Sequence, residues 1–242
     1  MSVAVRTERW EFTASPCGGV AMAINGADVV LKASGALHVT AHNALMVADL
    51  HFEKGSAYAA RGQLLPPYDT RETLTRLETE VAAIKPDLLI FLGDSFHDGR
   101  AEDRLAADDA ARLAALASGR TLVWVVGNHD ADGPRFLPGE IIDEMTLGTL
   151  VLRHEPQNGP QPGEVAGHLH PAAKVVGRGG RVRRRCFVTD GSRVVLPAFG
   201  SYAGGLNVRD EAFAPLFATR PMAAALGTGR VHAIGWKSLV GD

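Results

Sequence analysis

The chain has 242 residues, of which 46% are hydrophobic and 21% are charged, and its formal net charge is −2. This length allows one sizeable domain with a buried core, and the near-neutral balance gives no global indication of a nucleic-acid or membrane partner. Charged residues between 6 and 11, no apolar run approaching ~18 residues and only two cysteines predict a soluble cytoplasmic protein without a disulfide framework.

The N-terminal part of the chain predicts antiparallel β structure. We expect residues 1–18 to be a loosely ordered lead-in. From residue 20 to residue 39, short apolar stretches are separated by turn residues, including Asn25-Gly26. Asn-Gly between apolar runs is a strong hairpin signal, because tight hairpin turns require a left-handed backbone that these residues tolerate.

Three apolar segments in the front half predict buried strands, and each ends in a polar cluster. The segments are 44–48, 88–92 and 122–126, followed in order by Asp49-Leu50-His51, by residues 93–98 and by residues 127–130. Because strand ends carry the chemistry in open α/β sheets, we expect one functional rim here.

The connections between these strands predict helices. A polar loop is expected over residues 53–68, and Asp69 or Thr70 then caps a helix that ends at Lys85-Pro86. An alanine-rich helix over about 105–116 is closed by Gly119. Strands that alternate with helices in this way are typical of an α/β fold.

The back half predicts a second sheet of mixed or antiparallel pairing. Short strands with few helical patterns between them are expected at 149–152, 164–166, 182–188, 194–196 and 231–234. No internal repeat separates the halves, so we interpret residues 1–242 as a single two-sheet domain. We also expect Cys17 and Cys186 to be small buried hydrophobic residues.

Histidine, aspartate and asparagine recur at strand ends throughout this pattern. Alternation along an extended strand would project both ligands of Asp49-x-His51 to one side, and the same holds for His168-x-His170. Carboxylate, imidazole and amide ligands without cysteine suit Mn²⁺, Fe²⁺ or Zn²⁺ rather than a structural thiolate zinc site. A lone histidine is more often a packing residue, but these ligands are too numerous for one ion and would suit two ions that share a carboxylate.

The ordered set of Asp49-x-His51, Gly93-Asp94, residues 127–130, His154 and Gly167-His168-x-His170 resembles the motifs of the calcineurin-like binuclear metallophosphoesterases. The resemblance implies a four-layer α/β sandwich in which helices flank two mixed β-sheets. It also implies two divalent ions with Asp94 as the shared ligand. The first ion would be bound by Asp49, His51, Asp94 and His170, and the second by Asp94, Asn128, His154 and His168.

Three further residues near these motifs are candidates for catalysis. His129 is not needed as a ligand, so it would face the substrate phosphate and stabilise charge or protonate the leaving oxygen. Asp130 could orient the His129 ring, or could be a turn or capping residue. His97 stands where many relatives carry an acidic residue, and it could contact the phosphate or the leaving strand, or simply pack.

A narrower resemblance covers about residues 20–235. Five segments closely resemble the DNA-ligase-associated metallophosphoesterases: 49–55, 61–69, 93–98, 153–156 and 196–207. This resemblance implies a manganese-dependent phosphodiesterase, with Zn²⁺ or Fe²⁺ as alternatives, that acts as an endonuclease on single-stranded DNA in DNA repair. It also implies association with an ATP-dependent DNA ligase and a helicase, as a monomer or homodimer. The alternatives are a phosphatase for a small metabolite or phosphoprotein, and a catalytically dead scaffold.

Basic residues give weaker, independent support for a nucleic-acid substrate. Arg178, Arg181 and the run 183–185 follow the His168/His170 ligands, with Lys174 nearby, and phosphate backbones are bound by such clusters. Strand alternation would split the run between two faces, and a solvated edge strand is the competing interpretation. Lys54 and Arg61 are the other candidate phosphate contacts. Base stacking is conceivable for Tyr68, Phe96 and Tyr202, although packing is the simpler expectation.

Overall fold

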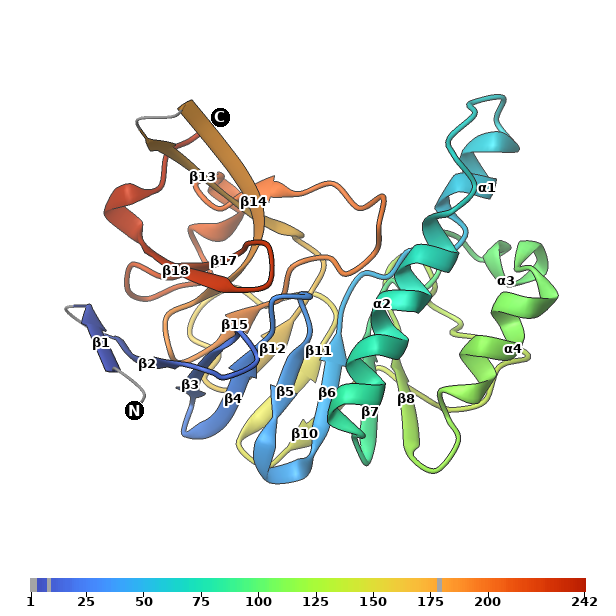
Figure 1. The fold of residues 1–242 in the computed structure, drawn as a ribbon, viewed down its shortest axis with the longest axis horizontal. Coiled ribbons are helices and arrows are strands. Elements are labelled where there is room, and N and C mark those ends of the chain that lie inside the picture. The colour runs from blue at the N-terminus through green and yellow to red at the C-terminus, as the bar shows by residue number, and fades with distance from the viewer. Residues whose placement is uncertain (1–3, 8–9, 178–179) are drawn as a thin grey trace.

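The structure, a computed structural model, describes residues 4–7, 10–177 and 180–242. Two β-sheets pack face to face, and α-helices cover the outer face of the first sheet (Figure 1). The outer face of the second sheet is covered by the segment around the 3₁₀ helix Glu211–Phe213. The predicted α/β architecture with two mixed sheets flanked by helices is confirmed.

The N-terminal strands of the first sheet pair antiparallel, and the strands that carry the predicted ligands at their ends pair parallel. Its strand order follows the chain: β1 (Ala4–Thr7), β2 (Trp10–Ala14), β3 (Val20–Ile24), β4 (Ala27–Leu31), β5 (Leu37–Val39), β6 (Ala44–Val47), β7 (Leu88–Leu92), β8 (Thr121–Val125) and β9 (Glu140–Ile142). Strands β6 to β9 are mutually parallel. The carboxyl ends of β6, β7 and β8 therefore share one edge of the sheet.

The predicted hairpin is present, whereas the predicted lead-in is wrong for its described residues. Asn25 and Gly26 join β3 to β4 with φ values of 46° and 81°, the left-handed turn that the Asn-Gly pair predicts. Within residues 1–18, β1 and β2 extend the sheet instead of remaining loose. The physical reason is that β3 would otherwise present an unpaired edge, which β2 covers by antiparallel pairing.

The second sheet is built from the back half of the chain. Its strands are β10 (Glu144–Leu147), β11 (Leu150–Arg153), β12 (Glu164–Ala166), β15 (Val194–Val195), β14 (Gly180–Thr189), β13 (Pro171–Gly177) and β16 (Leu206–Asn207) in spatial order, with β17 (Met222–Leu226) and β18 (Val231–Gly235) attached to β14. Parallel and antiparallel pairs both occur. Strand β13, which sequence patterns did not predict, pairs with most of β14.

In the part of the chain that the structure describes, four α-helices follow the front strands: α1 (Lys54–Ala59), α2 (Asp69–Ile84), α3 (Ala101–Arg104) and α4 (Ala107–Ala115). The α2 helix buries Leu74, Leu77 and Val81 against the first sheet, as its apolar spacing predicts. The predicted polar loop over 53–68 was wrong at its start, where α1 forms. This short helix follows directly from the His51 turn, so it stands beside the functional rim.

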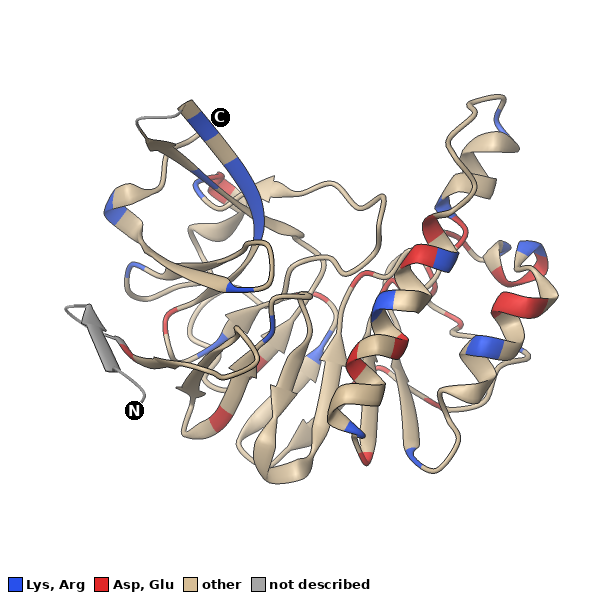
Figure 2. Cartoon of the chain, in the orientation of Figure 1, with Lys and Arg blue, Asp and Glu red and all other residues tan. Residues whose placement is uncertain are grey.

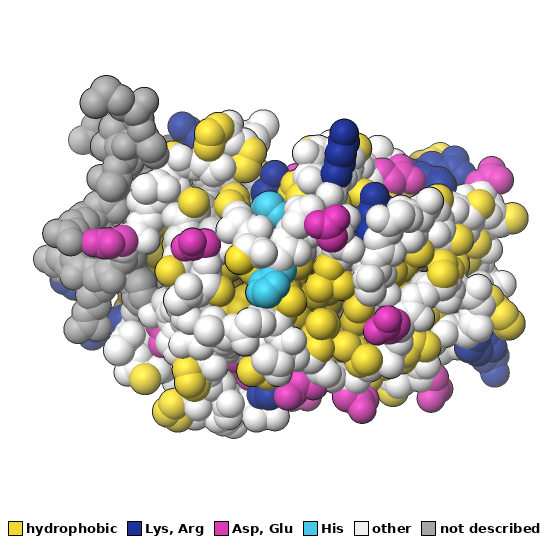
Figure 3. Space-filling view, turned by 90° about the horizontal axis from the view of Figure 1, so that it is seen from below, with side chains coloured by type: hydrophobic (Ala, Val, Ile, Leu, Met, Phe, Trp, Pro, Cys, Tyr) yellow, Lys and Arg dark blue, Asp and Glu magenta, His cyan; other side chains and the backbone are white. Residues whose placement is uncertain are grey.

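The inter-sheet core is the largest cluster of buried hydrophobic residues and includes Met46, Ile90 and Val123 from one sheet and Leu152 and Phe187 from the other. Burial of such side chains contributes about 1.5–3 kcal/mol each before entropy is counted. Figure 3 shows the face at the opposite end of the strands from the rim, where hydrophobic side chains gather among acidic ones.

Two smaller expectations can also be compared with the structure. In the described residues, no helix is long and apolar enough to span a bilayer. Both cysteines are free, and Cys186 is buried as predicted, whereas Cys17 is exposed. Burial raises the pKa of the Cys186 thiol, so this sulfur stays protonated and behaves as a hydrophobic side chain.

Candidate metal centre

The predicted metal ligands meet between the two sheets. Asp49 and His51 follow β6, Asp94 follows β7 and Asn128 follows β8, so the first sheet supplies its ligands from three parallel neighbours. The second sheet supplies His154 after β11, and His168 and His170 after β12. Residues distant in the sequence therefore converge because both sheets end their parallel strands at the same rim.

The backbone at these ligands differs from the extended geometry that alternation predicted. Asp49, His51, Asp94, His168 and His170 have φ values of 55°, 46°, 47°, 67° and 47°, all in the left-handed region. Non-glycine residues rarely adopt this conformation, and it persists only where the surroundings hold it. The backbone amides of Asp49 and His51 donate to the carbonyl oxygens of Gly93 and Asp94 at 3.1 and 2.9 Å. The ligand pairs converge by sharp turns rather than by strand alternation.

One group of ligand atoms is formed by Asp49, His51 and His170, whose ligand atoms lie within 4.8 Å of one another. Nε2 of His51 is 3.2 Å from Nε2 of His170, which in turn is 3.3 Å from Oδ1 of Asp49. Asp49 also accepts the backbone N–H of His168 with both carboxylate oxygens, at 3.1 and 3.0 Å. This carboxylate is therefore fixed by the second sheet.

A second group is formed by Asp94, His154 and His168, again within 4.8 Å. The Asn128 side-chain oxygen lies 3.0 Å from Nε2 of His154 and 3.0 Å from Nδ1 of His168. These two imidazole nitrogens are 3.2 Å apart. The predicted amide ligand thus faces the same point as the two histidines.

Asp94 lies between the two groups, as a shared ligand must. Its Oδ1 atom is 3.3 Å from Nε2 of His154, and its Oδ2 atom is 3.9 Å from Nε2 of His51. Imidazole nitrogens that face each other and a carboxylate at such distances are the donor arrangement that a divalent cation satisfies. The residues of both groups therefore fit two divalent ions, and the identity of the metal is left open by this oxygen and nitrogen set.

The charges at the centre favour a cation. Burial disfavours a proton on His154, yet its hydrogen bond with Asp94 and the charges of Asp49 and Asp94 raise its pKa to about 9. Burial also acts against the charge of Asp94, but the contact with His154 lowers the pKa of this carboxyl to about 2. A field that favours a proton on the His154 imidazole and ionisation of the Asp94 carboxyl also attracts a divalent metal ion.

Of the two roles predicted for Asp130, its hydrogen bonds fit that of a turn-stabilising residue. Its Oδ1 atom accepts the backbone N–H of Gly127 at 2.9 Å, and its Oδ2 atom accepts those of Ser95 and Phe96 at 2.7 and 3.1 Å. The prediction that Asp130 orients the His129 ring was wrong, because both carboxylate oxygens are committed to backbone amides. Asp130 ties the turn after β8 to the turn after β7, which is the alternative role of a turn-stabilising residue.

His129 is oriented by His97 instead. Nδ1 of His129 lies 2.9 Å from the backbone carbonyl oxygen of His97. Since a carbonyl only accepts, Nδ1 carries the hydrogen and Nε2 is left toward the centre, 4.0 Å from Oδ2 of Asp94. The two rings stack with centroids 5.6 Å apart and planes at 20°. Sequence reasoning had no signal for this backbone contact.

The predicted substrate contacts are spread around the centre. Lys54 lies half-buried at the start of α1, and Arg61 is exposed after its end. Arg181 is exposed on β14, whereas Arg178 lies outside the described residues. Of the aromatic candidates, Phe96 is buried against Trp124, so it cannot stack on a base, while Tyr68 is 64% exposed.

The segment 198–203 supports the metal centre, a role that the sequence did not predict. The segment 198–203 follows β15 and lies against the first ligand turn, where Phe199 N donates to Ala48 O at 2.8 Å and Gly200 N to Asp49 O at 3.0 Å. A Cβ atom on Gly200 would lie 2.1 Å from the Leu50 carbonyl oxygen. Arg76 from α2 donates to the Phe199 carbonyl, which fixes this segment further.

Comparisons with known proteins agree with this geometry. Residues 42–189 match the family model described as calcineurin-like phosphoesterase. Among solved structures, the chain is similar to the nuclease MPE of Pseudomonas putida, with a TM-score of 0.67 and 32% identity over 89% of this chain and 100% of that one. It is also similar to the phosphoesterase Yfce of E. coli, with a TM-score of 0.41 and 16% identity over 79% and 98% of the two chains.

A curated plant relative matches only locally. Over 92 residues the chain is 34% identical to the probable inactive purple acid phosphatase 29 of Arabidopsis thaliana. The match covers 36% of this chain and 23% of the plant protein, so it spans less than a quarter of that protein. This local likeness carries no information about substrate.

Proposed function

The chain belongs to the calcineurin-like phosphoesterase family and is a metal-dependent phosphoester hydrolase, and from this premise we propose that it is a manganese-dependent phosphodiesterase that cleaves single-stranded DNA internally. The observation that carries the proposal is that Asp94, a member of the group with His154 and His168, also faces His51 of the other group, with Oδ2 3.9 Å from Nε2. Support for a nucleic-acid substrate comes from the similarity to a nuclease over that protein's whole length.

The proposal gives each ligand a position. Asp49, His51 and His170 would hold one ion, Asn128, His154 and His168 the other, and Asp94 both. When bound, two such ions would supply Lewis-acid stabilisation of the phosphoryl oxygens and would lower the pKa of a nearby water. The turns at these ligands are held by backbone hydrogen bonds, which fix the positions of the side chains that would bind the ions.

His129 is the proposed proton donor to the leaving group. With its Nδ1–H donated to the His97 carbonyl, a protonated ring presents Nε2–H to the substrate side of Asp94. The ring is 41% exposed, so a bound phosphodiester can reach it. The leaving sugar oxygen is a strong base, and proton transfer from a positioned imidazolium lowers the barrier for its departure. His97 acts as a positioning residue through its carbonyl oxygen and stacked ring.

We extend the proposal to a cytoplasmic role in DNA repair, in association with a DNA ligase and a helicase, on the strength of the narrower family resemblance. The free cysteines are compatible with a reducing compartment. Copurification of a ligase with the tagged protein from its native host, lost in high salt, is the expected result. Absence of any ligase from such preparations would remove this part of the proposal.

The test is a comparison of substrates at equal Mn²⁺. We expect cleavage of circular single-stranded DNA and of bis-p-nitrophenyl phosphate, with weaker activity on duplex DNA and on p-nitrophenyl phosphate. Cleavage of a circle establishes internal scission. Activity confined to phosphomonoesters would contradict the proposal and indicate a phosphatase for a metabolite or phosphoprotein, whereas purified protein that binds no metal would indicate a scaffold.

A further inference from the structure

The hairpin of β13 and β14 has two chemically different faces. Directly opposed residues of antiparallel strands share a face, and the register opposes Lys174 to Arg183 and Val176 to Arg181. Lys174, Arg181 and Arg183 therefore lie on one face, here called the basic face. Arg184 points to the other side, as alternation along the strand predicted.

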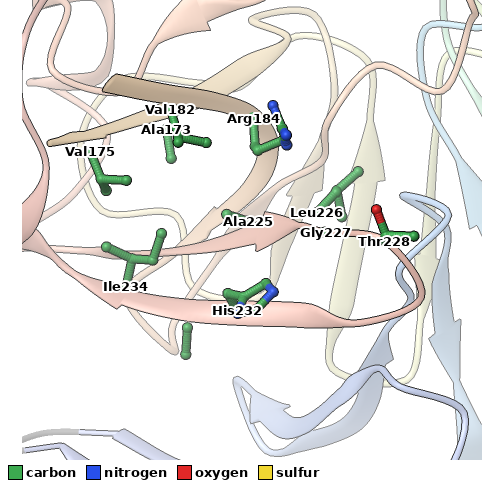
Figure 4. Close-up of a pocket in the computed structure, with 11 residues that line it drawn as sticks. Ala173, Val175, Val182, Arg184, Ala225, Leu226, Gly227, Thr228, His232 and Ile234 are labelled. Carbon is green, nitrogen blue, oxygen red and sulfur yellow. The ribbon is translucent and has the colours of Figure 1, made fainter. Parts of the chain in front are cut away.

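The opposite face of the hairpin is apolar. Ala173, Val175 and Val182 point toward β17 and β18, where they line an open cavity of about 560 Å³ together with Ile234 (Figure 4). Arg184 stands at the border of this cavity. Lys174, Arg181 and Arg183 therefore lie together on the face of the hairpin that points away from this cavity.

The basic face borders the metal centre. Strand β13 begins immediately after the ligand His170, whose carbonyl oxygen accepts the backbone N–H of Leu206 at 2.9 Å. Arg183 donates to the carbonyl oxygen of the adjacent Gly205 at 2.6 Å. At the root of the hairpin, Arg185 donates to the carbonyls of Ala198, Ser201 and Ala203 at 3.0–3.1 Å, so its charge is tied to the segment that supports the Asp49 turn. From the end of the hairpin that follows His170, the cations continue outward along β13 and β14, and Figure 2 shows the basic residues along β14.

An anion already lies between two of these cations. Asp242 places Oδ1 3.4 Å from Nζ of Lys174 and Oδ2 3.6 Å from Nη2 of Arg183. The Arg183 side chain remains 44% exposed and that of Asp242 59% exposed. Two cations that converge on one exposed carboxylate at these distances can equally bracket the non-bridging oxygens of a phosphate.

We propose that the basic face, Lys174, Arg181 and Arg183, binds the phosphodiester backbone of the single strand that extends from the metal centre past His170. The inference rests on the proposed function, since it assigns the path of that substrate. The basic face would contact phosphates and not bases. It would therefore increase affinity and orient the strand without selecting its base sequence.

The test is the salt dependence of binding to a fluorescein-labelled oligothymidylate, measured by anisotropy in EDTA so that cleavage cannot occur. The variant is Arg181→Ala/Arg183→Ala, and the control is Arg184→Ala, which removes one arginine charge from the neighbouring position on the opposite face. Arg181→Lys/Arg183→Lys keeps the charges and detects a merely structural effect. Thermal unfolding of each variant establishes that it is folded.

Each phosphate contact to a single strand contributes about 0.7 to the slope of log K against log salt, so the double alanine variant should lose about 1.4 of slope. If electrostatic binding vanishes near 1 M salt, this corresponds to roughly 25-fold weaker binding near 0.1 M. We expect Arg184→Ala to bind as the wild type does and the lysine pair to restore the slope.

Equal slopes in the wild type and the double alanine variant would overturn the assigned path, and so would an equal loss in Arg184→Ala. Hydrolysis of bis-p-nitrophenyl phosphate by the wild type reports on the proposed function separately. No hydrolysis together with the expected loss of DNA binding would reject the phosphodiesterase and retain the path. Hydrolysis together with unchanged DNA binding would retain the phosphodiesterase and reject the assigned path of the strand.

Discussion

The metal centre and the basic face lie side by side, yet the chain builds them in different ways. At the centre, five of the ligands stand on left-handed backbone, and most of the ligands are buried or half-buried and held by hydrogen bonds from both sheets. On the hairpin, Arg181 and Arg183 are exposed and Lys174 is half-buried, and all three stand on regular antiparallel strands. Each ligand at the centre is therefore held in place by several contacts at once. On the basic face each cation acts independently, so the contributions of the cations to the free energy of DNA binding should be additive.

Glycines make the constraint at the centre visible. A Cβ atom on Gly127 would lie 2.3 Å from Oδ1 of Asp94, and one on Gly93 would lie 2.1 Å from Nδ1 of His154. Real Cβ atoms do not approach other heavy atoms this closely. The ligand side chains therefore pack against positions where only glycine fits, and adding a single methyl group there should displace a ligand and weaken metal binding.

The largest effect is expected for Asp94→Ala. Loss of the shared carboxylate should reduce cleavage of both DNA and bis-p-nitrophenyl phosphate by roughly 10⁴-fold or more, because the centre supplies several kcal/mol of transition-state stabilisation. Steady-state kinetics at saturating Mn²⁺ measure it. Asp28→Ala, an exposed carboxylate on β4, is the control and should be neutral. Retained activity in Asp94→Ala would refute the shared-ligand assignment.

His129→Ala should distinguish proton donation from metal binding. We expect DNA cleavage to fall by about 10²–10⁴-fold and hydrolysis of bis-p-nitrophenyl phosphate by far less, since nitrophenolate leaves without a proton. His97→Ala keeps the carbonyl that orients His129, so its loss on DNA should be smaller. The ratio of kcat/KM values for the two substrates is the readout. Equal losses on both would assign His129 to charge stabilisation or metal assembly.

Gly93→Ala should weaken the second ligand group by displacing the His154 ring. We expect a loss of metal affinity of about 10–100-fold, the range seen when ligand support is removed, measured by calorimetric titration with Mn²⁺. Gly119→Ala is the matched control, because Gly119 also has a positive φ, 72°, but nothing within 4 Å of the added Cβ. It should lower the free energy of unfolding by about 1–2 kcal/mol and leave metal affinity unchanged. Similar metal affinities in the two variants would show that the centre tolerates the displaced ring.

The smallest effect is expected for Asp130→Asn. The amide oxygen can replace only part of the three backbone contacts, so the free energy of unfolding should fall by roughly 1–3 kcal/mol in urea titrations. The ratio of activities on DNA and bis-p-nitrophenyl phosphate should not change, because Asp130 does not hold the His129 ring. A changed ratio would restore the orienting role that the sequence suggested.

The sequence predicts what depends on local pattern. The Asn25-Gly26 hairpin, the strand Leu88–Leu92 and the helix up to Ile84 follow from turn chemistry and apolar spacing, and the structure has them. The convergence of two ligand groups was also predictable, because parallel strands end together and ordered motifs mark each end. The roles of those residues in catalysis stay predictions.

The remainder depends on contacts between segments that no local pattern encodes. The left-handed turns at Asp49 and His51 require hydrogen bonds from the β7 turn, so strand alternation gave the wrong geometry for the right pair. Asp130 stands next to His129 in sequence, but its carboxylate is used by amides more than thirty residues away. Strand β13 was missed because its pairing partner, rather than its own composition, makes it a strand.

The central claim is a centre that holds two divalent ions with Asp94 between them. The most direct measurement is Mn²⁺ stoichiometry by calorimetric titration of the metal-depleted wild-type protein, with elemental analysis of the dialysed product. Two ions per chain are predicted, one for each ligand group, and at most one in Asp94→Ala. A single ion in the wild type, or two in Asp94→Ala, would contradict the account.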